Sequence, residues 1–225
     1  MSNGRREPPG RVAIFGAGGL GRELLQVMRD IAASGLPCEP VSFIVDPGLD
    51  APASLHGVPV ARDAVAMLRA DPGLRMVVAL GDPAAREAVV ARITASTGPR
   101  FATLLHPRAW IGDTVEVGEG SMIFGFASAT TDIRIGRHVL VNPACAIAHD
   151  CVLEDFATLA PGVMLAGGAW LEAGCNLGTG AKVLPRQRIG RGAVVGGGAL
   201  VRAAVAAGAT VVGVPARDLA RPTKG

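Results

Sequence analysis

Tyrosine is absent from this 225-residue chain and aromatic residues make up only 4% of it, although hydrophobic residues make up 49%. A core of this composition must be filled by small aliphatic side chains, and the 31 glycines indicate many tight turns. The sequence also lacks a long apolar run without charges and a short apolar region near its start. We therefore expect no membrane helix, no signal peptide and a cytoplasmic protein.

The four cysteines form no CxxC pair and no metal-ligand pattern, which favours reduced thiols and no bound metal. The net charge of +3 is too small to indicate a nucleic-acid partner. The charge is unevenly placed, however, because the stretch between Glu172 and Asp218 contains no acid. Its basic residues are Lys182, Arg186, Arg188, Arg191, Arg202 and Arg217. One end of the protein is therefore expected to be basic.

An aliphatic residue recurs every six positions through the second half of the chain. The series runs Ile111, Val117, Ile123, Ala129, Ile135, Val141, Ile147, Leu153, Leu159, Leu165, Leu171, Leu177, Val183, Ile189, Val195 and Val201, without insertion. The residue four positions after each is usually small, and the positions between are polar or glycine. A period of six does not fit a helix of 3.6 residues per turn, but it fits short strands joined by bends. Three such sides close a triangular coil of eighteen residues, so the repeat predicts a parallel β-helix with the aliphatic and small positions inside.

The first half of the chain alternates predicted strands and helices. An apolar strand, a glycine turn and an amphipathic helix begin at residue 11. Strands are predicted over 41–46, 57–61, 75–82 and 100–107, and helices over 62–70 and 83–95. This order is typical of a small Rossmann-like parallel α/β sheet. We expect a disordered lead over 1–10, the α/β domain over 11–107, the β-helix over 108–214, and a tail over 215–225 that folds back on the last coil.

Gly16, Gly18 and Gly21 fit the pattern G-x-G-x-x-G between the first strand and the first helix. Backbone N–H groups in such a turn hold phosphate at a helix N-terminus, although the same pattern also serves a tight turn with close helix packing. Asp46 ends the second strand, where a carboxylate commonly meets a ribose or a base. A sheet of this size has no second mononucleotide half, so a nucleotide diphosphate fits better than NAD.

These motifs together resemble a known family. The opening "FGAGGLGRE", the join near "LHP", the hexads containing "HDCVLEDFATLAPG", then "LGTGAKV" and "GVPAR" are similar to the bacterial sialic acid O-acetyltransferase-like group, which includes nucleotide-sugar N-acetyltransferases. The resemblance implies a left-handed β-helix, a homotrimer, and acetyl-CoA in the groove between adjacent β-helices. It also implies that the first domain binds the nucleotide of an acceptor sugar. Many relatives have histidine where this chain has Leu20, and some where it has Thr158.

His149 and Asp150 carry the catalytic prediction. His149 follows Ile147 by two positions, at the bend, so its side chain is expected to point outward. An imidazole can remove a proton from an attacking nucleophile at neutral pH, and the adjacent carboxylate can orient the ring. The residue eighteen positions later is Gly167, whose N–H is a candidate oxyanion donor. A solvated turn histidine is the alternative interpretation.

Further residues are expected to bind the substrates. The candidate acetyl-CoA contacts are Gly167, Gly168, Gly178, Lys182, Arg186, Arg188 and Arg217, because arginine side chains bind phosphate oxygens. The candidate acceptor contacts are Gly16, Gly18, Gly19, Gly21, Asp46, Gly81, Asp82 and Asp132. Asp132 lies eighteen positions before Asp150, and we hypothesise that it holds the ammonium group of an amino sugar; an exposed turn acid is the alternative. The basic stretch has the alternative of an ordinary solvated surface.

The other candidates receive structural interpretations. His138 maps to another corner of the coil and is interpreted as a surface turn residue or an intersubunit contact. His106 is assigned to the domain join and His56 to a loop. Cys145, Cys151 and Cys175 occupy the small inward position, which argues against an acyl-enzyme and for direct transfer.

Three functions were compared. A carbonic anhydrase on this coil needs three zinc-binding histidines, whereas only two lie in the repeats and at different corners. A non-enzymatic β-helix scaffold would have a regular threonine-rich face and no nucleotide-type domain. The favoured function is acetyl transfer to the amino group of a nucleotide-linked amino sugar, with sugar O-acetylation as the open alternative.

Overall fold

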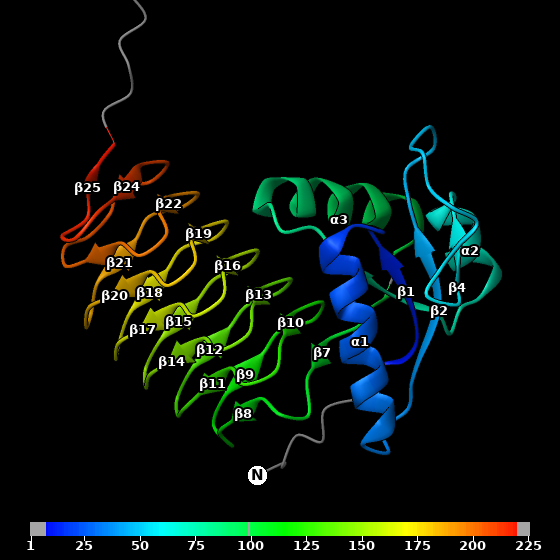
Figure 1. The fold of residues 1–225 in the computed structure, drawn as a ribbon, viewed down its shortest axis with the longest axis horizontal. Coiled ribbons are helices and arrows are strands. Elements are labelled where there is room, and N and C mark those ends of the chain that lie inside the picture. Colours follow the sequence, from blue (N-terminus) through cyan, green and yellow to red (C-terminus); the bar gives the residue numbers. More distant parts are fainter. Residues whose placement is uncertain (1–7, 99, 220–225) are drawn as a thin grey trace, which may run out of the picture.

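The structure, a computed structural model, describes residues 8–98 and 100–219. An α/β part comes first in the chain and a long coil of short strands follows it (Figure 1). The elements of the α/β part are β1 (Gly10–Phe15), α1 (Gly19–Ala33), β2 (Cys38–Ile44), β3 (Ser54–Leu55), β4 (Val58–Ala61), α2 (Ala64–Ala70), β5 (Arg75–Val78), α3 (Pro83–Thr97) and β6 (Arg100–Phe101).

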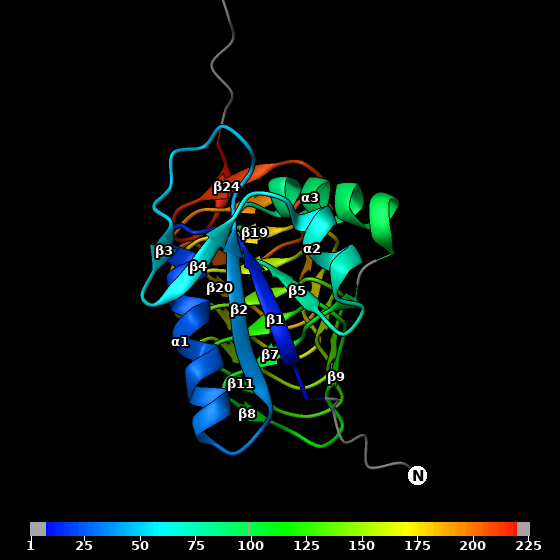
Figure 2. The same ribbon diagram turned by 90° about the vertical axis from the view of Figure 1, so that its right-hand side faces the viewer.

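The α/β part is a six-stranded sheet in the order β3-β4-β2-β1-β5-β6, parallel except for the short β3. Helix α1 covers one face, and α2 and α3 cover the other (Figure 2). Alternate residues of β1 explain this arrangement: Val12 and Ile14 pack with α1, whereas Ala13 and Phe15 pack with α2 and α3. The predicted Rossmann-like fold is therefore confirmed.

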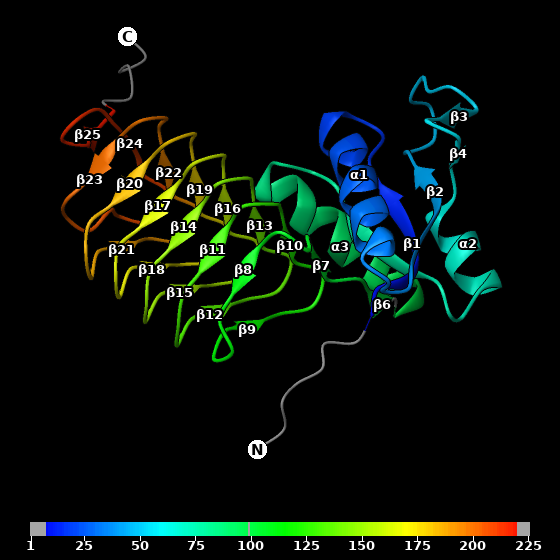
Figure 3. The ribbon, with the colours of Figure 1, turned by 60° about the horizontal axis from the view of Figure 1, so that its bottom comes forward.

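The coil consists of strands of two residues, except for the three-residue β24, in three sheets that are parallel apart from the last strand β25; the sheets are seen as three rows in Figure 3. The first face holds β7 (Leu104–Leu105), β10 (Met122–Ile123), β13 (Leu140–Val141), β16 (Thr158–Leu159), β19 (Asn176–Leu177), β22 (Val194–Val195), β24 (Thr210–Val212) and β25 (Arg217–Asp218). The second face holds β8 (Trp110–Ile111), β11 (Ser128–Ala129), β14 (Ala146–Ile147), β17 (Met164–Leu165), β20 (Lys182–Val183) and β23 (Leu200–Val201). The third face holds β9 (Glu116–Val117), β12 (Arg134–Ile135), β15 (Val152–Leu153), β18 (Trp170–Leu171) and β21 (Arg188–Ile189).

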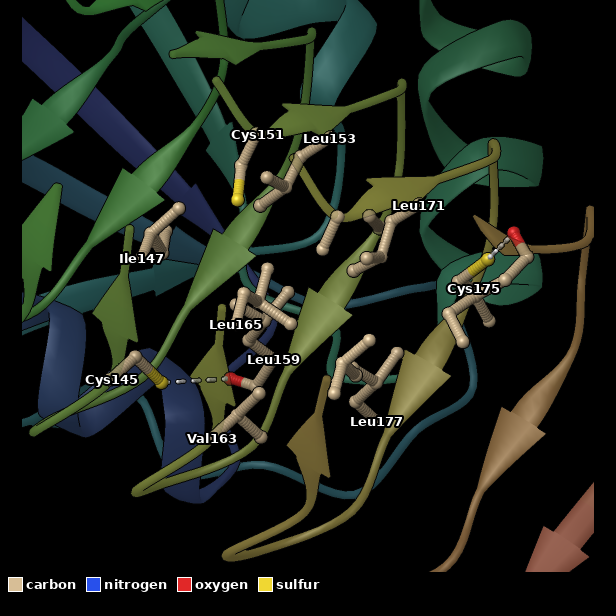
Figure 4. Close-up of a cluster of buried hydrophobic side chains, with 14 of the residues drawn as sticks. Cys145, Ile147, Cys151, Leu153, Leu159, Val163, Leu165, Leu171, Cys175 and Leu177 are labelled. Carbon is tan, nitrogen blue, oxygen red and sulfur yellow. Dashed lines mark hydrogen bonds between the residues drawn. The ribbon is translucent and has the colours of Figure 1, made fainter. Parts of the chain in front are cut away.

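The register of the coil is the predicted one. Ile147 of β14 pairs with Leu165 of β17, eighteen residues later, and the other consecutive coils follow the same spacing as far as Val201. The aliphatic and small positions fill the interior, where Figure 4 shows Cys145, Cys151 and Cys175 among leucine and isoleucine side chains. Burial raises the pKa of Cys145 to about 11 and that of Cys175 to about 12, so these thiols stay protonated. The parallel β-helix is therefore confirmed.

The corners of the coil explain its glycines. From Val117 to Val195, the residue three positions after each aliphatic of the series takes a positive φ, for example Asp150 at 60° and Gly168 at 70°. Glycine adopts this conformation without strain and aspartate tolerates it better than most side chains. The corner between the second and third faces, which carries Asp132, Asp150, Gly168 and Arg186 at this position, is called the His149 corner below.

The predicted strand 100–107 is wrong as a single strand. Ala102 donates its N–H to Met76 O in the α/β sheet, whereas Leu104 donates to Ser121 O in the coil, so β6 and β7 belong to different sheets. The first coil therefore begins at Leu104, before the predicted join. Met122 and Leu140 of the first face pack in one hydrophobic cluster with side chains of α1, which seats the α/β part on the coil.

The two ends of the chain were also predicted. Strand β25 pairs antiparallel with β24, with Val211 opposite Asp218, so the tail folds back on the last coil as expected for its described part. Residues 1–7 of the lead and 220–225 of the tail lie outside the described residues. Within the described residues, no helix combines the length and the apolar character needed to cross a membrane.

The interpretation of His138 as a surface turn residue is wrong, because its side chain is buried at 2% exposure. Its ring stacks on Phe156 at 5.1 Å and meets Phe101 edge-on at 4.6 Å between centroids. Phe101 belongs to β6, so a residue of the α/β part covers this corner. Burial lowers the pKa of His138 to about 4, which keeps the imidazole neutral at neutral pH.

Candidate active site

His149 projects from the His149 corner. Strand β14 ends at Ile147 and the chain turns through Asp150, which leaves the His149 side chain 64% exposed, as predicted. Its Nδ1 lies 2.7 Å from Oδ2 of Asp150. A carboxylate can only accept, so Nδ1–H donates this bond and Nε2 is the nitrogen left to take up a proton. The predicted pair is therefore formed.

The imidazole lies over Gly167 of the next coil. A Cβ added at Gly167 would be 2.6 Å from His149 Cε1 and 2.7 Å from Nε2, so only glycine leaves room for the ring. Gly168 donates its N–H to His149 O at 2.9 Å and locks the two coils together. The Gly167 N–H meets no acceptor among residues 8–98 and 100–219. The glycine therefore lets the ring lie against the backbone of a residue whose N–H has no acceptor in this part of the chain.

The pair opens into a cavity of about 360 Å³. It is lined by His149, Asp150, Gly167, Gly168, Pro185 and Arg186. Arg186 follows Gly168 by eighteen residues and occupies the same corner position, with a φ of 58°. The cavity thus combines a basic nitrogen, a backbone N–H and a guanidinium.

The remaining predicted acetyl-CoA contacts do not gather at this cavity. Lys182 points outward from the second face, and Gly178 lies on the first face. Arg188 lies on the third face, where it pairs with Glu172 and stacks 4.8 Å above the ring of Trp170. Arg217 is exposed in β25 at the end of the coil. Within one chain, Gly167, Gly168 and Arg186 are the members of that set which line the His149 cavity.

The predicted acceptor residues lie mainly at the carboxyl edge of the α/β sheet. Gly16 and Gly21 make the tight turn after β1, since a Cβ added at Gly21 would lie 2.0 Å from Gly16 O. Gly18 caps α1, and Gly19 is its first residue. Among residues 8–98 and 100–219, no side chain caps this helix start, so its amide groups stay available for an anion.

Two predicted acceptor carboxylates already have partners. Asp46 accepts a hydrogen bond from Arg92 Nη2 of α3 at 2.6 Å, in a pair that the sequence had not indicated. Asp82, beside the exposed Gly81, caps α3 by accepting from Ala85 N at 2.7 Å. The Asp46 carboxylate is therefore held in place by the Arg92 guanidinium, and the Asp82 carboxylate serves as the N-cap of α3.

Asp132 lies one coil away from Asp150 at the same corner, as predicted. Its N–H donates to Thr114 Oγ1 at 2.7 Å, and its Oδ2 accepts from Thr131 Oγ1 at 3.2 Å. The coils are joined here by the bond from Asp150 N to Thr131 O at 3.2 Å. Two exposed carboxylates on adjacent coils make this edge of the corner attractive to a cation.

Two side-chain contacts join the α/β part to the coil, and sequence reasoning missed the first of them. Arg86 of α3 is fully buried and hydrogen-bonds to the coil, and His106 Nε2 lies 2.9 Å from Asp30 Oδ2 of α1. The second contact fits the assignment of His106 to the domain join. The first left a signal: Arg86 precedes the apolar Val89 and Val90 by three and four residues, which places it on the buried side of the helix.

The second face, which borders the His149 corner, exposes several apolar side chains beside the polar Ser128, Thr130 and Lys182. Trp110 is 62% exposed, Met164 49% and Leu184 40%. Ala146, Ala166 and Leu200 join Met164 and Leu184 around a shallow cavity of about 350 Å³ on this face. Several large apolar side chains are therefore exposed on this face, beside the His149 corner.

Within the described residues, no cluster of three or more histidine, cysteine or acidic side chains is arranged to hold a metal ion. The coil and its exposed imidazole together define a hexapeptide-repeat acyltransferase, the class that the sequence motifs resemble.

Comparisons with known proteins narrow this class. Residues 11–93 match the family model described as PglD N-terminal domain. The GDP-perosamine N-acetyltransferase of Escherichia coli O157:H7 is 33% identical over 215 residues, which cover 92% of this chain and 96% of that protein.

Two solved structures are similar over nearly the whole chain. PerB from Caulobacter crescentus in complex with CoA and GDP-perosamine superimposes with a TM-score of 0.83 at 30% identity, covering 94% of this chain and 98% of PerB. The acetyltransferase domain of PglB from Neisseria gonorrhoeae in complex with acetyl coenzyme A gives a TM-score of 0.81 at 27% identity, with coverages of 93% and 98%.

The chain belongs to the hexapeptide-repeat nucleotide-sugar N-acetyltransferases of the sialic acid O-acetyltransferase-like group. It is an acyl-CoA-dependent sugar acetyltransferase, and acetyl-CoA is its co-substrate.

Proposed function

We propose that this enzyme transfers the acetyl group of acetyl-CoA directly to the amino group of a nucleotide-linked amino sugar, with His149 as general base. The observation that carries the proposal is the exposed His149 ring, held by Asp150 over Gly167. A cytoplasmic location follows from the proposed reaction, because acetyl-CoA and nucleotide sugars are cytoplasmic metabolites.

The proposed chemistry uses the two ring nitrogens of His149 differently. The amine of the acceptor attacks the thioester carbonyl, and Nε2 takes the proton that the amine loses. The hydrogen bond from Nδ1 to Asp150 stabilises the imidazolium that forms, and the imidazolium then returns the proton to the departing CoA sulfur. Base catalysis of this kind contributes about 10²–10⁴-fold to the rate.

The free N–H of Gly167 is the proposed oxyanion donor. In the tetrahedral intermediate the former carbonyl oxygen carries a negative charge, and a fixed amide beside it lowers the energy of that state more than that of the thioester. Gly168 cannot serve in this way, because its N–H is bonded to His149 O. Its role is to fix the corner.

We propose that acetyl-CoA lies along the His149 corner, with Arg186 meeting its phosphate groups. The other basic candidates, Lys182, Arg188 and Arg217, belong to other surfaces of the same chain. They can contribute to this cofactor only if a neighbouring copy brings one of those surfaces to the corner.

A homotrimer with active sites between subunits meets this requirement. The second face, with its exposed apolar side chains, borders the His149 corner, so a copy packed on Trp110 and Met164 would also wall the His149 cavity. The substitution Met164→Glu is expected to shift the protein from trimer to monomer in light scattering and to abolish activity. A monomeric wild-type protein with full activity would contradict the trimer.

The acceptor is proposed to bind at the carboxyl edge of the α/β sheet. Its diphosphate meets the amide groups at the start of α1, and its ribose or base meets Asp46, which Arg92 holds in place. Because the E. coli and C. crescentus relatives are named for GDP-perosamine, a GDP-linked amino sugar is the first acceptor to test. Asp132 is proposed to attract the ammonium form of the amine. O-acetylation is the alternative, and the names of these relatives favour the amine.

The test measures thiol release from acetyl-CoA with GDP-, UDP- and dTDP-linked amino sugars, and identifies the acetylated atom by NMR. We expect amide formation with at least one of them, and loss of turnover in His149→Ala. The matched control is the same nucleotide sugar with a hydroxyl group in place of the amine. Acetylation of that control at an equal rate would favour the O-acetyltransferase, and thiol release that persists in His149→Ala would remove the base assignment.

A further inference from the structure

Arg86 is the largest fully buried side chain among the residues whose burial the structure describes. The other arginines whose burial the structure describes are exposed, or half-buried in the case of Arg75. Burying a guanidinium costs several kcal/mol unless its N–H groups find acceptors. A buried arginine on a helix that faces another domain therefore requires an explanation.

The guanidinium of Arg86 joins three segments of the chain. Nε donates to His138 O at 2.9 Å, and Nη1 donates to Leu80 O at 2.6 Å and Gly81 O at 3.2 Å. Nη2 donates to Phe156 O at 2.7 Å, Ala157 O at 3.4 Å and Thr158 Oγ1 at 2.9 Å. One side chain thus links the loop after β5 to two consecutive coils of the β-helix.

None of these acceptors is a carboxylate. Burial lowers the pKa of Arg86 to about 10, with the nearby Asp82 acting in the opposite direction, so the group is still charged at neutral pH. Backbone carbonyl groups stabilise its charge. These carbonyl groups keep their positions only while the loop at 80–81 and the coil segments at 138 and 156–158 stay in place. A flexible lysine has three donors and no planar fork, so it cannot reproduce this pattern.

Thr158 completes the junction. Its hydroxyl accepts from Arg86 Nη2 and donates to Gly81 O at 3.1 Å, so it bridges the coil to the same loop. The hydroxyl is 72 residues from Arg86 in sequence and belongs to β16 of the first face. Figure 1 shows α3 lying beside the coils that contain β13 and β16.

The loop held in this way lies next to the glycine turn. Ala79 donates its N–H to Phe15 O at 2.7 Å, and a Cβ added at Gly16 would lie 2.8 Å from Ala79 O. The loops after β1 and β5 therefore form one edge of the sheet, the edge at which parallel α/β sheets bind ligands. A shift of the loop at 79–82 would move the proposed acceptor site.

We propose that Arg86, together with Thr158, is a positioning residue for the acceptor: it fixes the acceptor-binding edge of the α/β sheet against the β-helix that carries the catalytic corner. This inference rests on the proposed function. The inference holds whether the acceptor meets His149 of the same copy or of a neighbouring copy. In both cases the acceptor-binding edge is positioned relative to a β-helix, and Arg86 fixes that edge to the β-helix of its own chain. Neither side chain needs to touch acetyl-CoA.

The test compares Arg86→Lys, Thr158→Val and the control Ile93→Val in the full-length protein. Ile93 is a core residue of α3 with 1% exposure, so its truncation lowers stability without touching the junction. We expect Arg86→Lys to lower kcat/KM for the nucleotide amino sugar by on the order of 10²-fold, the effect of a misplacement of about 1 Å. Thr158→Val should lower it about two- to tenfold, the value of one hydrogen bond. The KM for acetyl-CoA should stay unchanged in both variants.

A second measurement follows the loop directly. Deuterium uptake by residues 79–82 should rise in Arg86→Lys and Thr158→Val, and uptake at the His149 corner, residues 147–151 and 165–168, should not. If the two variants lose only thermal stability, as Ile93→Val does, and keep the acceptor kcat/KM and the loop protection of the wild type, the inference is overturned. Should Arg86→Lys fail to fold, Thr158→Val decides by the same criteria. A wild-type protein that acetylates no nucleotide amino sugar would instead overturn the proposed function, and the acceptor role with it.

Discussion

His149 and His138 are eleven residues apart, carry the same side chain, and stand at two corners of one coil, yet they are in opposite states. His149 is 64% exposed, bonded to a carboxylate and close to a backbone amide. His138 is 2% exposed between two aromatic rings, and its Nδ1 has no hydrogen-bond partner among the described residues. The hexad repeat places both at a bend, and the surroundings of each corner then decide the chemistry.

The comparison shows that a corner position in a β-helix does not by itself determine whether a side chain is exposed or buried. The residues that pack on the corner determine it. At the His149 corner the next coil offers glycine and leaves the imidazole in water. At the His138 corner the α/β part supplies Phe101 and the next coil supplies Phe156, and the imidazole between these rings is 2% exposed. The following predictions separate the two histidines, beginning with the largest expected effect.

Replacing His149 with alanine should lower kcat by about 10²–10⁴-fold, because the base is lost, and should leave the melting temperature unchanged, because the side chain is exposed. His138→Ala is the matched control: it should lower the melting temperature and keep the rate per folded molecule within a small factor. Steady-state kinetics and thermal unfolding of both variants measure the contrast. Equal effects of the two substitutions on kcat would remove the distinction between the corners.

Gly167→Ala should lower kcat on the order of 10²-fold, since the added methyl group would occupy the space of the His149 ring and displace it by about 1 Å or more. The control is the same substitution in a His149→Ala background. If the methyl group acts through the ring, it should cause no further loss there, which a double-mutant cycle detects. Additive losses would mean that the methyl group harms the coil itself.

His138 should make the stability of the protein depend on pH. Its pKa is about 4 in the folded state and about 6.5 when unfolded, so the unfolded state binds more protons between these values. The contribution of His138 to stability should be constant above pH 6.5 and should be lost as the pH drops from 6.5 toward 4, by about 3 kcal/mol in total.

Urea unfolding between pH 4 and 8 measures this loss. His138→Phe serves as the control because Nδ1 has no partner to lose and the position already lies between aromatic rings. This variant should lack the His138 component of the pH dependence. An unchanged pH profile would show that His138 does not titrate as a buried group.

Asp132→Asn should have the smallest effect. The exposed carboxylate is proposed to attract the ammonium form of the acceptor, and such pairs contribute about 0.2–1 kcal/mol. We therefore expect the KM for the amino sugar to rise a few-fold at low salt and less at high salt, with kcat unchanged. An unchanged acceptor KM at low salt would leave Asp132 as an exposed turn acid.

Much of the coil could be predicted because its information is local. A period of six assigns each residue to a face, a corner or the interior, and it correctly placed Ile147 inside, His149 outside and Gly167 beside it. The inward cysteines followed from the same count. Sixteen consecutive repeats leave little freedom of register, so the prediction needed no long-range information.

The failures involve contacts that depend on how the elements pack together and not on a short sequence pattern. His138 is buried by Phe101, and the segment 100–107 divides between two sheets, because the α/β part packs on the first coils. Arg86 and the Asp46–Arg92 pair depend on where α3 lies, which no short pattern encodes. The predicted acetyl-CoA contacts do not lie together for a related reason. Residues that are close in the basic stretch of the sequence are distributed over three faces because the chain winds around the coil.

The uniform pairing at eighteen residues also limits how such a chain can change in length. Six residues inserted between Gly168 and Arg186 would preserve every strand and every inward aliphatic residue, yet they would rotate Arg186 by one third of a turn to another edge of the prism. The His149 cavity would lose its guanidinium while the fold stayed intact. A chain of this architecture therefore keeps its corners aligned only if it lengthens by whole coils of eighteen residues or by a loop that leaves the prism at a corner. His149 and Arg186 share one edge only while the number of residues between their corner positions is a multiple of eighteen.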